Sequence, residues 1–233
     1  MGNATNRRQV SAAGGRALFC AVVLLACCQA AGAAVLEVSA TGGGEVLADA
    51  VVSLHGAQAS TATPATRASM DQRGSQFVPH VLPVQAGTSV VFPNSDQIRH
   101  QVYSFSASKR FELPLYAGTS ASPIRFEQPG IVVLGCNIHD WMIGYVVVLD
   151  TPYFGKTGSN GKVQLDVPAG KYRMQVWHPR MAGAPLQQQV TLVAGKPLAI
   201  EVALDVAAEA RVGPGNDRLR ALQEKFRKIK PSP

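Results

Sequence analysis

The sequence is poor in charged residues, in aromatic residues and in cysteine. Only 16% of its 233 residues are charged and 6% are aromatic, whereas 46% are hydrophobic. This apolar content excludes disorder as the main description of the chain. Only one apolar run approaches the length of a membrane span, which excludes a multipass membrane protein. A chain of this length can form one large or two small domains with a hydrophobic core.

That apolar run lies within residues 1–33, which predict an export signal. The segment contains no acidic residue and has three basic ones, Arg7, Arg8 and Arg16. A stretch of 12 apolar residues, Ala17 to Cys28, precedes the small residues Ala31-Gly32-Ala33, which suit a cleavage site. Because such a stretch is too short to cross a bilayer, we expect cleavage and a periplasmic location.

Three other outcomes stay open for this segment. An uncleaved signal would act as an N-terminal membrane anchor. Leu24-Leu25-Ala26-Cys27 weakly matches a lipoprotein signal, which would leave a lipid anchor on Cys27. Arg7-Arg8 is a twin-arginine pair whose flanks fit that export route poorly. Cleavage without a lipid anchor is favoured over either anchor, and the export route stays open.

The scarcity of cysteine becomes sharper after cleavage. The signal contains Cys20, Cys27 and Cys28, so the mature chain would keep only Cys136. A single thiol cannot form an internal disulfide. In an oxidising compartment a lone thiol is a chemical liability unless it is buried or bound to a metal. Cys136 is therefore the residue that needs an explanation.

The body of the chain, from about residue 35 to 205, predicts an all-β fold. Helical periodicity is absent, and Gly and Pro interrupt short apolar segments throughout. Continuous apolar runs at Ile131–Leu134 and Tyr145–Leu149 predict strands that are buried on both faces. Many short strands separated by turns indicate a β-sandwich.

Alternating apolar residues mark three further strands, which are expected to bury one face each. They fall at residues 163–167, 172–176 and 198–204. Asn160-Gly161 precedes the first of them, and Pro168-Ala169-Gly170 separates the first from the second. These turn residues predict that the first two strands form a hairpin.

The tail, residues 206–233, differs from the body. Asn216 or Asp217 is expected to cap an amphipathic helix that ends near Lys230. Its apolar stripe consists of Leu219, Leu222, Phe226 and Ile229. The tail has seven Lys or Arg and three Asp or Glu, whereas residues 34–205 have 12 of each sign. The net charge of +7 is thus no sign of a nucleic-acid groove on the fold. The helix is expected to dock on the body, or to contact an acidic partner or anionic lipid.

The segment from Cys136 to Met142 places a thiol, an imidazole (His139) and a thioether within seven residues. It lies between two predicted strands, which indicates a loop at one end of a sandwich. His100 lies 36 residues upstream of Cys136. One Cys, two His and one Met form the ligand set of a blue-copper electron-transfer site. Thiolate is soft and donates strongly to copper, imidazole suits both oxidation states, and a weak axial thioether favours Cu(I).

Other interpretations of these residues are weaker. A structural zinc site needs a closed set of nitrogen and sulfur ligands, and a binuclear copper centre needs two thiolates. No second cysteine survives cleavage of the signal. A thiol protease would not need the methionine. Taken singly, His100 is compatible with a surface strand, Met142 with a core filler and Cys136 with a buried inert thiol.

Residues 66–150 resemble a cupredoxin, the fold of type 1 copper proteins. The pattern Cys136-x-x-His139-x-x-Met142 is similar to the short ligand loop of amicyanin. The run from Phe77-Val78-Pro79 through Gly87-Thr88 to Phe92-Pro93-Asn94-Ser95-Asp96 resembles the plastocyanin-like approach to the first ligand. Bacterial proteins of this longer build are often labelled methylamine-utilisation proteins.

The resemblance implies a Greek-key sandwich and a role for each motif residue. His100, Cys136 and His139 would be the equatorial copper ligands, and Met142 the axial one. Asn94 would join the two ligand loops through hydrogen bonds, as a residue behind the ligands.

Two features depart from the family pattern. His80 is an extra histidine, either a surface residue or an additional or alternative copper ligand. Asp140-Trp141 replaces a smaller or proline-containing spacing. Trp141 would pack in the core beside the site or join a docking patch.

The rest of the body has a second resemblance. Residues 35–56 and 151–205 together look like one carboxypeptidase-regulatory-type β-sandwich, a small transthyretin-like fold. The cupredoxin would then be inserted between its early strands and its Thr157-Gly158-Ser159-Asn160-Gly161 turn. His55 and His178 lie in this part and are expected to be ordinary polar residues.

These patterns predict a periplasmic electron carrier with one type 1 copper and no catalysed reaction. Its partner would be a redox enzyme such as a dehydrogenase, or a cytochrome, docked on an apolar patch of Ile138, Trp141 and Ile143. The alternative is a copper-binding or envelope interaction module that does not shuttle electrons. The lack of Met- or His-rich tracts disfavours copper trafficking, and the lack of paired histidines disfavours a copper oxidase or reductase.

Overall fold

The computed structural model describes residues 1–2, 32–56, 67–118 and 122–208. Nearly all of the predicted export signal and the predicted tail helix lie outside these ranges and stay predictions. Within them every regular element is a β-strand, which confirms the all-β prediction. No helix of the described residues is long and apolar enough to span a membrane. The strands all belong to one unit, Ala31–Pro233.

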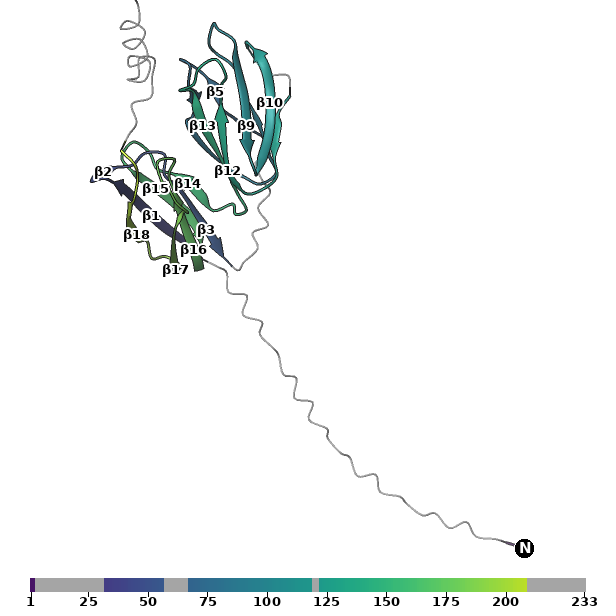
Figure 1. Ribbon diagram of the computed structural model, residues 1–233. Helices are drawn as coiled ribbons and strands as arrows, with labels where there is room; N and C mark the ends of the chain where they lie inside the picture. The colour runs from purple at the N-terminus through teal and green to yellow at the C-terminus, as the bar shows by residue number, and fades with distance from the viewer. Residues whose placement is uncertain (3–31, 57–66, 119–121, 209–233) are drawn as a thin grey trace, which may run out of the picture. The chain divides into compact units, whose positions relative to one another are not determined.

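The central part of the chain, Arg67–Leu149, forms a sandwich that we call the inserted sandwich. Its strands are β4 (Arg67–Ser69), β5 (Asp71–Gln72), β6 (Phe77–Val78), β7 (Val81–Gln85), β8 (Thr88–Val91), β9 (His100–Ser106), β10 (Lys109–Tyr116), β11 (Ile124–Phe126), β12 (Gly130–Gly135) and β13 (Ile143–Leu149). One sheet has the order β10-β9-β12-β13-β7, of which Figure 1 labels the first four strands, and the other has the order β11-β8-β4. Both are mixed, because β7 pairs parallel to β13 and β4 parallel to β8.

Side chains from both sheets fill the core of the inserted sandwich. Its fully buried large residues include Met70, Phe77, Phe92, Phe126 and Leu134. The prediction that β12 is buried on both faces is wrong, because Val133 is 43% exposed. The same prediction is confirmed for β13, which is buried on both faces from Val146 to Leu149. An apolar run cannot show how far a second layer covers each of its faces. On the outer face Val147 and Leu149 of β13 are buried in a second cluster, whereas in β12 only the partly buried Ile131 reaches that cluster.

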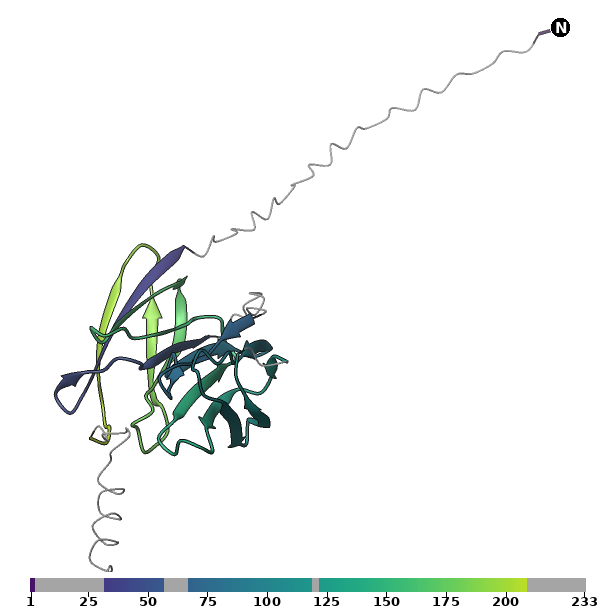
Figure 2. The ribbon, with the colours of Figure 1, turned by 90° about the horizontal axis from the view of Figure 1, so that it is seen from above.

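The remaining strands form a second sandwich, which we call the split sandwich. They are β1 (Ala33–Gly42), β2 (Glu45–Val46), β3 (Val51–Gly56), β14 (Phe154–Lys156), β15 (Lys162–Pro168), β16 (Gly170–Trp177), β17 (Leu186–Leu192) and β18 (Leu198–Leu204). Its sheets have the orders β15-β1-β18 and β14-β3-β16-β17 (Figure 1). In the second view the purple β1 lies beside the yellow-green β18, with which it pairs (Figure 2). Strands before the inserted sandwich thus pair with strands after it. The resemblance to a carboxypeptidase-regulatory fold stays a prediction.

The hairpin predicted from Pro168-Ala169-Gly170 is wrong. β15 pairs with β1, whereas β16 pairs with β3 and β17, so the turn carries the chain from one sheet to the other. The Tyr172 hydroxyl donates a hydrogen bond of 2.9 Å to the Pro168 carbonyl and holds this corner. Alternation correctly predicted one buried face for each strand. It could not predict the pairing, because two strands in opposite sheets of one sandwich alternate in the same way as two paired strands of a hairpin.

Candidate metal centre

Two neighbouring strands bring the predicted ligands together. His100 is the first residue of β9, and Cys136 directly follows β12. The two strands meet through the pair Tyr103 and Gly135, so His100 and Cys136 lie at the same end of the sheet. His139 comes from the turn between β12 and β13.

The three side chains form a tight group. The ligand atoms of His100, Cys136 and His139 all lie within 4.8 Å of one another. The Nδ1 atom of His100 is 3.9 Å from the Sγ atom of Cys136, and the two imidazole ring centres are 5.0 Å apart. His100 and Cys136 are buried, whereas His139 is half-buried and its ring packs against Trp141 at 5.0 Å. Trp141 is itself half-buried.

His139 carries a polar atom with nothing to bind. Its Nδ1 atom is buried and has no hydrogen-bond partner among the described residues. Desolvation by burial, and then the nearby His100, lower the pKa of His139 below its ordinary value of 6.5. A buried nitrogen without a partner costs free energy. A neutral imidazole with an unused nitrogen beside a thiol offers donor atoms that copper binds, so these residues fit such an ion.

Met142 lies beside this group at the end of the turn. Its side chain is 1% exposed and belongs to the same hydrophobic cluster as Cys136. The backbone N–H of Met142 donates to the carbonyl of His139 at 2.9 Å, which closes the turn between them. The segment from Cys136 to Met142 is thus a short loop between β12 and β13, as its position in the sequence predicts.

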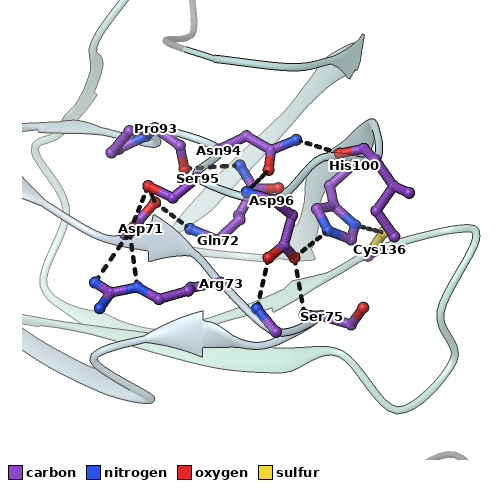
Figure 3. Close-up of polar contacts among 12 residues, drawn as sticks. Asp71, Gln72, Arg73, Ser75, Pro93, Asn94, Ser95, Asp96, His100 and Cys136 are labelled. Carbon is purple, nitrogen blue, oxygen red and sulfur yellow. Dashed lines mark hydrogen bonds and ion pairs between the residues drawn. The ribbon is translucent and has the colours of Figure 1, made fainter.

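Sequence reasoning missed Asp96, which touches His100 directly. An oxygen of the Asp96 carboxylate lies 2.7 Å from the Nε2 atom of His100 (Figure 3). The backbone N–H groups of Gly74 and Ser75 donate to the same carboxylate at 2.7 and 2.9 Å. Burial opposes the charge, but the bonds from Ser75, His100 and Gly74 hold the pKa of Asp96 below its ordinary value. The only sequence signal was its place in the run before His100.

Asn94 has other partners than the family resemblance implies. Its Nδ2 atom donates to the carbonyls of Ile98 at 2.9 Å and Tyr116 at 2.8 Å, and its Oδ1 atom accepts from the N–H of Asp96 at 3.0 Å. These bonds shape the loop before His100 and join it to the end of β10. In the described contacts Asn94 does not reach the segment from Cys136 to Met142.

A different pair of side chains joins the two ligand loops. Asn137, next to Cys136, donates from Nδ2 to the Oε1 atom of Gln101, next to His100, at 2.5 Å. Gln101 in turn donates to Glu112 on β10 at 2.6 Å. No sequence motif marks this pair, because it depends on the pairing of β9 with both β10 and β12.

The other histidines of the body lie outside the group of three. His80 is exposed, and its ring packs edge-on against Tyr145 at 5.3 Å. His55 lies between Ser53 and Asp150, at 3.0 and 2.8 Å. His178 lies with its Nε2 atom 3.2 Å from the Ala48 carbonyl. These contacts give each ring a polar or aromatic neighbour away from Cys136.

Comparison with known proteins returns likenesses to solved structures alone. No protein-family model matches the chain, and no curated protein is significantly similar to it. A purple cupredoxin from Nitrosopumilus maritimus is 24% identical over 35% of this chain and 99% of its own, with a TM-score of 0.32. A reduced amicyanin variant is 20% identical over 42% of this chain and 99% of its own, with a TM-score of 0.33.

A third likeness is to a copper-containing nitrite reductase from Thermus scotoductus. It is 26% identical and has a TM-score of 0.35. The matched region covers 41% of this chain but only 25% of the reductase. The function proposed below rests on the residues and geometry of the site.

Proposed function

We propose that the protein is an exported type 1 copper protein that carries electrons in the periplasm and transforms no substrate. His100, Cys136 and His139 are the equatorial ligands, and Met142 is the axial one. The supporting observation is the convergence of a buried thiol and two imidazoles within 4.8 Å, one imidazole having a buried nitrogen without a partner. Copper supplies one-electron chemistry to such a ligand set.

The chain contributes a rigid and dry ligand frame. Cys136 follows the end of β12 and belongs to a hydrophobic cluster, and His100 is fully buried at the start of β9. The hydrogen bond between Asn137 and Gln101 links the two loops. A frame that keeps the same ligand positions in both oxidation states lowers the reorganisation that accompanies electron transfer.

The surface beside His139 suits a transient partner. Ile138 is 48% exposed and Ile143 is 39% exposed, and both are near the half-buried Trp141. A small apolar patch around a partly exposed ligand supports docking without tight binding. The proposed partner is a redox enzyme such as a dehydrogenase, or a cytochrome. In this arrangement His139 is the side chain through which the electron enters and leaves.

Copper loading of the mature chain tests this function. The Cu(II) protein should be blue, with strong absorption in the red and a type 1 EPR spectrum. Cys136→Ala should abolish both signals, whereas Asp140→Asn, an exposed change in the same loop, should keep them. A colourless Cu(II) protein would refute the assignment. A blue protein that transfers copper but exchanges no electrons with a cytochrome would instead favour a copper-binding module.

A further inference from the structure

We propose that Asp96 is a positioning residue for the copper centre, an inference that rests on the function proposed above. Its carboxylate accepts a hydrogen bond from the Nε2–H group of His100 and thereby turns the Nδ1 lone pair of the same ring toward Cys136. Two distances agree with this geometry: 2.7 Å from an Asp96 oxygen to Nε2, and 3.9 Å from Nδ1 to the sulfur of Cys136 (Figure 3).

The position of the Asp96 carboxylate is determined by its own contacts. One oxygen accepts the backbone N–H of Gly74 and the other the N–H of Ser75, which come from the β5–β6 hairpin. Its backbone N–H is bound to the side chain of Asn94. The side chain is 16% exposed, whereas the His100 side chain is fully buried. Hydrogen bonds from two segments thus fix the position of Asp96 before any metal binds.

The fixed carboxylate of Asp96 determines which nitrogen of His100 can bind a metal. In a neutral imidazole one ring nitrogen carries a proton and the other has a free lone pair. A hydrogen-bond acceptor beside one nitrogen keeps the proton there and leaves the lone pair on the other. An ionised carboxylate only accepts, so it selects the Nε2–H form. It also makes the ring a stronger donor to a metal, as carboxylates behind histidine ligands do. Its negative charge should favour Cu(II) over Cu(I).

Asp96→Asn interferes with this contact in a specific way. The carboxylate has three N–H donors around it, from Gly74, Ser75 and His100. An amide has one accepting oxygen and one donating nitrogen. Either orientation therefore places an NH₂ group against a backbone N–H, and one orientation also donates to Nε2 and selects the wrong form of His100.

Asp71→Asn is the matched control. Asp71 has the same side-chain exposure as Asp96, 16%, and lies in the same network (Figure 3). Its carboxylate accepts bonds from the Ser95 hydroxyl and from Arg73. The two variants lose the same charge, but only one changes the contact to His100.

The experiment has one measurement on the metal-free protein and one on the copper protein. Nitrogen-15 NMR of the metal-free wild type should show His100 protonated at Nε2. In competition titrations, Asp96→Asn should weaken Cu(II) binding about 10- to 100-fold. It should also raise the reduction potential by more than Asp71→Asn does. Asp71→Asn should leave the affinity within a few fold of wild type.

The outcomes separate the two proposals. A wild-type His100 protonated at Nδ1 would overturn the role of Asp96, and so would equal effects of the two variants. If Asp96→Asn does not fold, the wild-type NMR result alone decides. A copper-loaded wild type without a type 1 spectrum would refute the proposed function, which is a different measurement from the NMR test.

Discussion

The split and inserted sandwiches differ in what their buried polar side chains contact. In the split sandwich, Thr157 donates to the Leu47 carbonyl at 2.6 Å and accepts the Ala50 N–H at 2.9 Å. In the inserted sandwich, His139 leaves a buried nitrogen without a partner among the described residues. Polar groups whose bonds are complete stabilise a fold, whereas an unpaired one marks a place where something else can bind.

Buried side-chain atoms without a partner among the described residues occur in both sandwiches. In the part of the chain that the structure describes, four buried side-chain atoms have no hydrogen-bond partner. Three of them lie in the inserted sandwich, on Gln72, Thr88 and His139, and the fourth is on Arg180. Only the atom of His139 lies in a group of potential metal ligands. An unpaired atom therefore points to a site when other suitable ligands converge on it.

The largest effect is expected from Thr157→Val. The change keeps the shape of the side chain but leaves the Leu47 carbonyl and the Ala50 N–H, both buried, without this partner. The free energy of unfolding should fall by about 2–4 kcal/mol in urea titrations of the metal-free protein. Thr191→Val, at an exposed position, is the control and should stay within about 0.5 kcal/mol of wild type. A loss below 1 kcal/mol for Thr157→Val would contradict this view of the split sandwich.

A smaller effect, of opposite sign, is expected from His139→Leu. The substitution removes the unpaired nitrogen, so the metal-free protein should be as stable as wild type or up to about 1 kcal/mol more stable. Copper binding should nevertheless weaken strongly. Urea unfolding of the metal-free chain and copper titration measure the two effects. A metal-free variant destabilised by more than about 1 kcal/mol would show that His139 stabilises the fold and would break the comparison.

The smallest effect is a pH dependence in the split sandwich. Burial, and then the nearby Arg180, lower the pKa of His178 below its ordinary value of 6.5. The unfolded chain therefore takes up a proton at a higher pH than the folded chain, and stability falls as the pH drops below 6.5 toward the folded value. In urea titrations at several pH values, His178→Gln should make this decline shallower. An unchanged slope would mean that other groups cause it.

Local features of the sequence predicted much of the site. Cys136, His139 and Met142 lie in one short segment, so their proximity follows from covalent spacing alone. His100 was predicted from the run that precedes it, and the structure places it within 4.8 Å of the other two ligand atoms. The one-faced strand at residues 198–204 is confirmed as β18, because alternation reflects burial directly.

The residues that support the site were not predicted, for a physical reason. Gln101 meets Asn137, and the Gly74 and Ser75 amides meet Asp96, across segments that are far apart in the chain. The strand pairing determines these contacts, and any buried amide or acid is compatible with many pairings. The mistaken hairpin at Pro168-Ala169-Gly170 has the same cause, because alternation reports which face is buried and not which strand lies beside it.

The sequence by itself therefore determined the fold class, the kinds of donor atom and the loop that carries three of them, since these depend on residue type and short spacing. Only the tertiary structure decided which strands lie side by side, which nitrogen of His139 is left unpaired and which carboxylate faces His100. Those facts depend on hydrogen bonds and packing between distant segments, which become determined when the whole core assembles.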